Sequence, residues 1–272
     1  MNLVEQTPAV TFYRIPRGDN AHVDTLAKLV KEMARPLEDS IEGKFIKILE
    51  GLELYTRVLS ETDERRILDC IFDLRDRGRA GLLTKRTYSE PKKWMRGKER
   101  IIIQCSCCYN FTNDKQGNQP GILRYDQVDP LPPMIKWMII RMVKWNILPA
   151  TCIPNSCIIN IYEEDDCIPP HINHHDFVRP FYTVSFISKS NILFRKAIYV
   201  IGPGKFRGAV EIPIPVGSVL VLKGDGADIA KHCIPGVRHR RVSVTFRKMD
   251  DSKIPYGFQQ DPELEELFPY EL

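Results

Sequence analysis

The sequence predicts an α+β protein that is mainly β, a double-stranded β-helix (jelly roll) with helices backing one sheet. Two observations support this prediction. Beyond residue 150, short apolar runs alternate with turn residues and no helical pattern intervenes, which is typical of an antiparallel sandwich or barrel. Before residue 150, two segments have apolar side chains at helical spacing, and these predict the helices.

The composition favours a single core. With 272 residues, 43% of them hydrophobic, the chain has enough apolar side chains for one sizeable domain. We expect a catalytic domain over residues 44–250, an N-terminal extension over residues 1–43 and an acidic C-terminal tail over residues 251–272. No apolar run reaches the roughly 18 residues that cross a bilayer, and the first residues lack the pattern of a secretory signal. We therefore expect a soluble protein with no membrane partner, in the reducing cytoplasm and/or nucleus.

The first predicted elements lie before residue 80. Residues 44–55 alternate well enough for a strand, which Gly51 interrupts. Ser60 is a good N-cap, and the apolar stripe that follows it predicts a helix from Glu61 to Arg77. Gly78 is the predicted stop of this helix, because glycine is common just after the last helical residue.

The next predicted elements are a strand, a loop and a helix. Residues 100–104 predict a strand, and residues 113–121 predict a loop because they are rich in Gly, Pro and Asn. Residues 134–148 are apolar on every side, so we expect a helix that packs onto a sheet. The predicted strands of the jelly roll follow at residues 156–164, 181–188, 191–195, 197–202, 208–215, 217–224 and 241–248.

The eight cysteines, without a secretory signal, indicate reduced and buried side chains rather than disulfides. The run Cys105-Ser106-Cys107-Cys108 contains one C-x-x-C pair, and no second pair at zinc-binding spacing follows it. We therefore expect these residues to lie in strands of the core. A cupin-like binding protein that holds zinc in this region is an alternative.

A histidine-rich segment predicts a metal site. His171 and His174 lie in the run IPPHINHHDF, and His232 lies just beyond a predicted strand. Non-haem iron(II) oxygenases hold their metal with two neutral imidazoles and one carboxylate, and side chains at i and i+2 of an extended chain point to the same side. Two registers are open: His171 with Asn173, and His174 with Asp176. A polar turn and a satisfied core histidine are the alternative interpretation.

The last predicted strand has one polar face, which consists of Arg241, Ser243, Thr245 and Arg247. Two arginines that point into a barrel need an anion, and a dicarboxylate such as 2-oxoglutarate suits arginine because each carboxylate accepts two of its hydrogen bonds. On another strand, Asn160 and Tyr162 point together to one side. We expect them to face the cavity, where their hydrogen-bonding groups would orient such a co-substrate.

In this order, the motifs resemble the AlkB family of nucleic-acid dealkylating dioxygenases. The family pattern of N-x-Y, H-x-D, a distal His and R-x5-R is matched by Asn160-Ile161-Tyr162, His171-Ile172-Asn173, His232 and Arg241 to Arg247. The runs WMRGKER, CCYNF, NIYEEDDCIPPH, FVRPFYTVSF and GADIAKHC look like the plant branch related to RNA N6-methyladenosine demethylases. The resemblance covers roughly residues 45–255.

The resemblance implies an oxidative demethylase that uses Fe(II) and 2-oxoglutarate, with ascorbate as reductant in vitro. The implied reaction converts 2-oxoglutarate to succinate, hydroxylates the N-methyl group and releases formaldehyde. The implied metal positions are His171, Asn173 and His232. The implied 2-oxoglutarate contacts are Asn160, Tyr162, Ser243, Arg241 at the distal carboxylate and Arg247 near the metal-binding end.

Asn173 departs from the family pattern, which has an acid at this position. Its amide oxygen can approach a metal, but an amide lacks the negative charge that offsets Fe²⁺. We expect weaker iron binding and slowed or absent turnover, and Asp176 is the candidate surrogate carboxylate. An engineered substitution, a natural paralogue without activity and an enzyme that tolerates a weak ligand are all open. The alternative function is a catalytically inactive RNA-binding paralogue.

A basic segment predicts the nucleic-acid contact. From Lys85 to Arg100, basic residues outnumber acids and two aromatic residues lie among them, a composition expected for binding single-stranded RNA. A solvated basic loop is the alternative. The resemblance implies that residues 85–111 recognise the methylated RNA, and single-stranded DNA stays open as a partner. The predicted substrate contacts are Arg96, Lys98, Arg100 and Tyr109, the last as a wall for the flipped methylated base.

Overall fold

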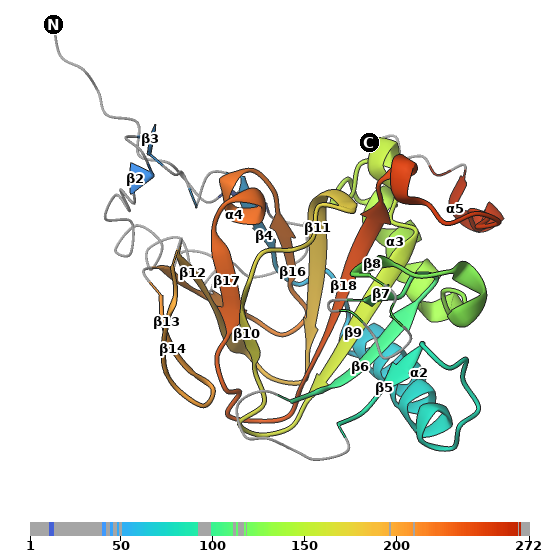
Figure 1. Cartoon of the computed structure of the whole chain (residues 1–272), viewed down its shortest axis with the longest axis horizontal. Helices are drawn as coiled ribbons and strands as arrows, with labels where there is room; N and C mark the ends of the chain where they lie inside the picture. The colour runs from blue at the N-terminus through green and yellow to red at the C-terminus, as the bar shows by residue number, and fades with distance from the viewer. Residues whose placement is uncertain are drawn as a thin grey trace, which may run out of the picture.

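Two facing β-sheets form the body of the molecule, and helices cover the outer face of the larger sheet (Figure 1). The computed structural model describes residues 11–13, 40–41, 44–45, 48, 51–91, 99–110, 113, 117, 119–195, 197–208, 210–265 and 267. Within this part of the chain, neighbouring strands run antiparallel except β1 and β4, which run parallel. The predicted fold class, a mainly β jelly roll with helices backing one sheet, is confirmed.

The larger sheet brings together strands that are far apart in the sequence. Its order is β1 (Thr11–Tyr13), β4 (Leu52–Tyr55), β16 (Val219–Leu222), β11 (Phe177–Phe186), β18 (Arg241–Met249), β9 (Ser156–Tyr162), β6 (Ile101–Cys105) and β5 (Tyr88–Ser89). In the middle of the sheet, Arg241 of β18 lies opposite Tyr162 of β9, and Ser243 lies opposite Asn160. Because opposite residues share a face, the polar side chains of both strands project to the same side.

The smaller sheet has four strands, in the order β10 (Ile168–His171), β17 (Lys231–Ile234), β12 (Ser190–Arg195) and β15 (Val210–Ile214). The sequence does not predict β10 and β17. Pro169 and Pro170 occupy the middle of β10, and proline cannot donate to a ladder. They are tolerated because β10 is an edge strand.

Short pairs and short helices complete the described chain. The pairs are β2 (Ser40–Ile41) with β3 (Lys44–Phe45), β7 (Tyr109–Asn110) with β8 (Gly121–Ile122), and β13 (Tyr199–Gly202) with β14 (Lys205–Arg207). The short helices are η1 (Tyr125–Gln127), η2 (Ala150–Cys152), α4 (Asp225–Asp228), η3 (Asp251–Lys253) and α5 (Pro262–Glu265).

Helix α2 (Glu61–Arg79) begins where the sequence predicts. The Ser60 hydroxyl accepts the backbone N–H of Asp63 at 3.1 Å, and the Asp63 carboxylate accepts the N–H of Ser60, so a capping box closes the first turn. The predicted stop at Gly78 is wrong, because the helix continues past it. A Cβ at Gly78 would lie 2.3 Å from the Tyr88 ring, so this glycine lets β5 approach the helix closely.

Helix α3 (Pro133–Lys144) packs onto the larger sheet, as predicted. Its buried side chains are Ile135, Met138, Ile139, Met142 and Val143. They share one hydrophobic core with α2 and with side chains of β6, β9, β11, β16 and β18. Arg141 lies at the rim of this core, with its guanidinium 5.2 Å from the Trp137 ring centroid and 4.6 Å from that of Trp145.

A second hydrophobic core lies between the two sheets. Because successive side chains of the central strands point to opposite faces, this core is separate from the core under the helices. On β9, Ile159 and Ile161 point toward the helices, whereas Asn160 and Tyr162 point into the space between the sheets. The prediction that Asn160 and Tyr162 project together into a cavity is therefore confirmed.

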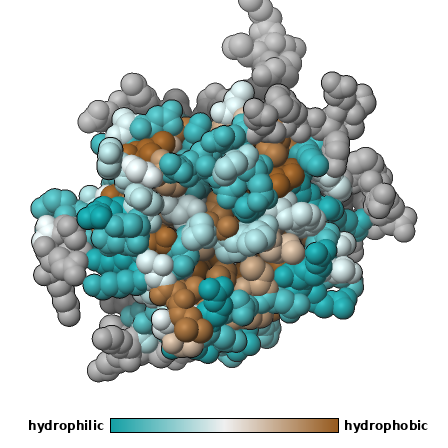
Figure 2. Space-filling view, turned by 90° about the vertical axis from the view of Figure 1, so that its right-hand side faces the viewer, coloured by the Kyte–Doolittle hydropathy of each residue, from teal (hydrophilic) through white to brown (hydrophobic). Residues whose placement is uncertain are grey.

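The acidic C-terminal segment packs against α3. Leu264 of α5 is 1% exposed and belongs to the core under the helices. The Lys136 ammonium lies 3.1 Å from a carboxylate oxygen of Asp261 and 2.5 Å from one of Glu263. On the helix side of the molecule the surface is mainly hydrophilic, with small apolar patches (Figure 2). Among the described helices, none has both the length and the apolar character that crossing a membrane requires.

Candidate active site

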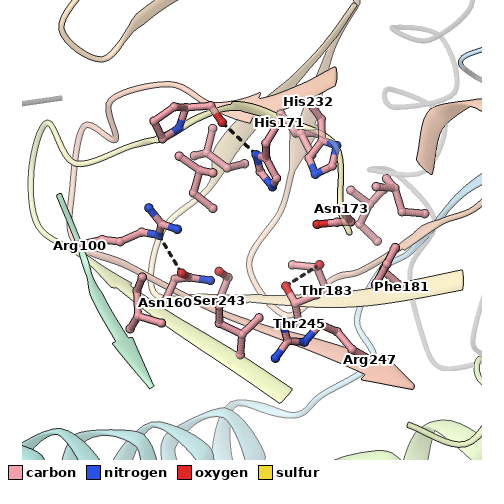
Figure 3. Close-up of a pocket in the computed structure, with 18 of the residues that line it drawn as sticks. Arg100, Asn160, His171, Asn173, Phe181, Thr183, His232, Ser243, Thr245 and Arg247 are labelled. Atoms are coloured by element: carbon pink, nitrogen blue, oxygen red, sulfur yellow. Dashed lines mark hydrogen bonds between the residues drawn. The ribbon is translucent and has the colours of Figure 1, made fainter. Parts of the chain in front are cut away.

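A cavity of about 350 Å³ lies between the two sheets (Figure 3). Strands of the smaller sheet supply His171 and His232, and β18 of the larger sheet supplies Arg241 and Arg247. His174 and Arg100 also line the cavity, from segments outside the strands. The cavity lining includes all the residues predicted to bind metal or 2-oxoglutarate, namely Asn160, Tyr162, His171, Asn173, His232, Arg241, Ser243 and Arg247. Two of the predicted substrate contacts, Arg100 and Tyr109, line it as well.

The two predicted metal-binding histidines face each other. His171 of β10 pairs in register with His232 of β17, and their ring centroids are 4.4 Å apart. Burial lowers the pKa of both imidazoles, most strongly for His232, so both favour the neutral form that binds metals. The His171 Nδ1 lies 2.9 Å from the Pro169 carbonyl, which can only accept, so Nδ1 carries the proton and Nε2 is the nitrogen left for a metal.

Asn173 completes this group from the loop that follows β10. Its amide lies beside the two imidazole rings in Figure 3. The rival His174–Asp176 pair has a different environment. His174 is exposed, its Nδ1 lies 3.4 Å from a carboxylate oxygen of Asp176, and Asp176 is not part of the cavity lining. The geometry therefore favours the register of His171 and Asn173.

Arg241 is 1% exposed, and its charge is incompletely paired. Its Nη2 donates to the Ser185 hydroxyl at 3.0 Å, and its guanidinium lies 5.1 Å from the Tyr162 ring centroid. Nε and Nη1 have no hydrogen-bond partner among the described residues. Burial lowers the pKa of Arg241, which shows that the site itself disfavours the cation.

Arg247 is a second buried arginine whose guanidinium is incompletely paired. It is 6% exposed, its Nη2 lies 3.5 Å from the side-chain oxygen of Gln104, and its Nε has no partner in the described part of the chain. An anion with two carboxylates would satisfy the unpaired nitrogens of both arginines. The donor set in the cavity thus fits a dicarboxylate next to a metal held by neutral imidazoles.

Two further polar contacts lie on the side of the cavity that the larger sheet forms. Arg100 Nε donates to the side-chain oxygen of Asn160 at 2.8 Å, so Arg100 orients a predicted co-substrate contact (Figure 3). The hydroxyls of Thr183 and Thr245 lie 2.9 Å apart on neighbouring strands. Arg100, which the sequence assigns to RNA, therefore lies inside the cavity against a residue assigned to 2-oxoglutarate.

Tyr109 forms an aromatic wall. It is buried, and its ring centroid lies 4.6 Å from that of His174 and 5.7 Å from that of Phe177. Burial raises the pKa of Tyr109 to about 12, so the phenol is neutral at physiological pH. This arrangement suits a flat base that enters the cavity mouth.

The structure describes only part of the basic segment from Lys85 to Arg100. Arg96 and Lys98 lie outside the described residues, so their predicted contact with substrate stays a prediction. Tyr88, one of the aromatic residues in this segment, has a structural role. Its hydroxyl donates to Glu90 at 2.6 Å, and its ring packs against Gly78 of α2.

Sequence reasoning missed Gln104, which connects two parts of the site. Its side-chain oxygen accepts from the Tyr109 N–H at 3.1 Å and from Arg247, and its Nε2 donates to the Cys108 sulfur at 3.3 Å. Gln104 is a buried polar residue that directly follows the three isoleucines of β6. A lone amide in an apolar strand is the sequence signal that would have identified it.

The cysteine cluster does not converge on one point. Cys105 belongs to the core under the helices, whereas Cys107 belongs to the core between the sheets. Cys108 is engaged by Gln104. The described cysteines are free thiols; six of them are buried, whereas Cys70 and Cys152, predicted to be buried as well, are half-buried.

No protein-family model matches the chain. It is 53% identical over 234 residues to "RNA demethylase ALKBH9B" of Arabidopsis thaliana, covering 86% of this chain and 46% of that protein. "RNA demethylase ALKBH10B" of the same species is 27% identical over 209 residues, covering 77% and 37%. "RNA demethylase ALKBH5" of Xenopus tropicalis is 34% identical over 152 residues, covering 52% and 41%. The chain thus spans less than half the length of these curated relatives.

A solved structure described as "The structure of OsALKBH1" superposes with a TM-score of 0.47 and 15% identity, covering 73% of this chain and 98% of that one.

Proposed function

Because the chain belongs to the AlkB family, in the branch of the ALKBH RNA demethylases, we propose that it binds Fe(II) and 2-oxoglutarate and removes the methyl group of N6-methyladenosine in single-stranded RNA. One observation carries the proposal. In a single cavity, two neutral histidines face two buried arginines with unpaired nitrogens. We expect it to act in the cytoplasm and/or the nucleus.

The proposed metal ligands are His171 and His232, with the amide oxygen of Asn173 in the third position. When bound, iron supplies the oxidising chemistry, and the protein supplies position and exclusion of water. The distal carboxylate of 2-oxoglutarate would take the unpaired nitrogens of Arg241, whose guanidinium is already oriented by Ser185. Arg247 would bind the end of the co-substrate nearer the metal.

The remaining residues position the co-substrate and the RNA. The Asn160 side chain accepts a hydrogen bond from Arg100 and points into the cavity beside Ser243. Tyr109 and His174 would stack on the flipped methylated base at the mouth of the cavity. The polar contacts of Arg96 and Lys98 with phosphates complete the proposed RNA interface.

Asn173 stands at the proposed position of the third metal ligand. An amide supplies no charge to offset Fe²⁺, so we expect weaker metal binding and slow or absent turnover. The test incubates the chain as given, and its Asn173→Asp variant, with Fe(II), 2-oxoglutarate, ascorbate and a short N6-methyladenosine RNA. Mass spectrometry then measures the unmodified adenosine formed. A matched single-stranded DNA measures the preference for RNA.

Turnover by the Asn173→Asp protein alone would establish an inactivated demethylase. Turnover by both proteins would mean that the amide, or Asp176 in its place, suffices as a ligand. Turnover by neither protein would reject N6-methyladenosine RNA as the substrate.

Asn173 also favours a second candidate function, an RNA-binding protein without catalysis. This candidate predicts that the chain as given binds N6-methyladenosine RNA more tightly than unmethylated RNA, while neither protein turns over. Fluorescence anisotropy with both RNAs measures this difference. Equal affinity for the two RNAs would reject a reader of the methyl mark.

A further inference from the structure

A single side chain, Arg179 of β11, holds the loop that carries residue 173. Its Nη2 donates to the backbone carbonyl of Asn173 at 2.9 Å. Its Nη1 donates to the carbonyls of His174 at 3.1 Å and Phe177 at 2.6 Å. Arginine can do this because its donors form a rigid planar fork.

The same guanidinium reaches the segment that leads to the second histidine. Arg179 Nε lies 2.6 Å from a carboxylate oxygen of Asp228 in α4, the helix that immediately precedes β17 and His232. The guanidinium also lies 5.0 Å from the ring centroid of Phe181, which lines the cavity. The Arg179 side chain is 14% exposed and that of Asp228 is 43% exposed, so water partly screens this ion pair.

The two histidines do not need Arg179 to meet, because His171 and His232 are paired in register across the smaller sheet. Residue 173, by contrast, lies beyond the end of β10, where no ladder fixes the chain. Among the described residues, the hydrogen bond from Arg179 is the one that anchors its backbone.

We propose that Arg179 is a positioning residue that holds position 173 against the two histidines, so that it affects metal affinity through residue 173. This inference rests on the metal site proposed above. A positioning role differs from a general role in folding. The effect of Arg179 on metal affinity must vanish when the side chain at position 173 has no atom that can bind the metal.

The test is a double-mutant cycle read by metal binding instead of turnover. Cobalt(II) is titrated into four proteins, which carry Asn173→Asp or Asn173→Ala, each with or without Arg179→Lys. Lysine keeps a charge for Asp228 but cannot donate to three carbonyls in the same geometry. In the Asn173→Asp protein we expect Arg179→Lys to weaken cobalt(II) binding about tenfold, as loss of a group that orients a ligand does. In the Asn173→Ala protein we expect no further loss.

Equal losses in both backgrounds would overturn the proposal, because Arg179 would then act on the histidines or on the fold. No loss in either background would overturn it as well. If Arg179→Lys lowers the Tm so far that it prevents titration, Asp228→Asn replaces it. That variant keeps the guanidinium, and the same dependence on residue 173 is expected with a smaller loss.

The experiment uses neither RNA nor 2-oxoglutarate, so its outcome is separate from that of the demethylation assay. Absence of cobalt(II) binding by all four proteins would reject the metal site and this inference together. Binding that follows the predicted cycle would support Arg179 even if the substrate proposal failed.

Discussion

Arg241 and Arg247 are cations that the fold buries without complete pairing. A buried charge without a counter-ion lowers the stability of the folded state, and a bound anion offsets that cost. The ligand-free protein is therefore destabilised at the place proposed for 2-oxoglutarate.

Arg241→Met should separate stability from binding. We expect the unfolding free energy of the ligand-free protein to stay the same or rise by about 1 kcal/mol, because an unpaired buried cation is removed. The thermal stabilisation by 2-oxoglutarate should be lost, since a ligand raises the Tm only by binding the folded state. Thermal melting with and without 2-oxoglutarate measures both effects. Arg65→Met, on the exposed side of α2, is the control, and a lower stability of Arg241→Met without ligand would contradict the account.

Gln104→Glu tests the link between the two parts of the site. A carboxylate at this position would pair with Arg247 and compete with the anionic co-substrate for it. We expect the Kd for 2-oxoglutarate to rise about tenfold, which corresponds to about 1.4 kcal/mol. Calorimetric titration measures it. Gln104→Leu removes the amide without adding charge, so a smaller rise is expected there, and equal values for both variants would count against charge competition.

Asp166 gives a pH dependence. Burial raises its pKa from 3.8 to about 6, so the folded protein binds this proton more tightly than the unfolded chain. The ionised form therefore destabilises the fold, and stability is lost as the pH rises from about 4 to about 6.

Asp166→Asn should remove that loss, because the amide oxygen can still accept the Glu163 N–H. We expect the variant to be more stable than the parent at pH 8 by about 1 kcal/mol or more, and the difference to shrink toward pH 4. Urea unfolding across this range measures it. The exposed Asp251→Asn is the control, and a gain that does not change with pH would disprove the assignment.

At the scale of elements, local patterns predicted the two long helices and most of the long strands, but none of the short helices η1, η2, α4, η3 and α5. The N-cap Ser60 and the apolar spacing after it were enough for α2, and two-residue alternation was enough for β9 and β18. β10 and β17 escaped prediction, because β10 contains two prolines and both strands depend on pairing with distant segments. Local sequence does not encode such pairing.

The C-terminal segment allows a test of an element. Leu264 is buried under α3 although the segment around it is acidic. Leu264→Ala should lower the unfolding free energy by about 2 to 4 kcal/mol, as loss of a buried leucine does. Glu265→Ala, one residue away and exposed, should change it by less than about 0.5 kcal/mol. Chemical denaturation of both variants measures this, and equal small effects would mean that the segment behaves as a free tail.

At the scale of the whole molecule, the site is assembled from both sheets. The sequence predicted His171, Asn173, His232 and the two arginines as one site, because these residue types at these spacings form a recognisable order, and the structure brings them to one cavity. It did not identify Gln104 or Arg179, because their roles come from contacts with segments that are distant in the sequence or from backbone carbonyls, which leave no pattern. The placement of Arg100 against Asn160 was likewise a property of the fold.

The anchoring of residue 173 has an evolutionary consequence. Arg179 holds this loop through main-chain carbonyls, which every amino acid possesses, so the scaffold does not depend on which side chain stands at 173. An exchange between an acid and an amide there alters the chemistry and leaves the architecture intact. If the proposed metal site holds, an exchange between asparagine and aspartate at this position, which needs one codon change, would switch the third ligand without rebuilding the loop.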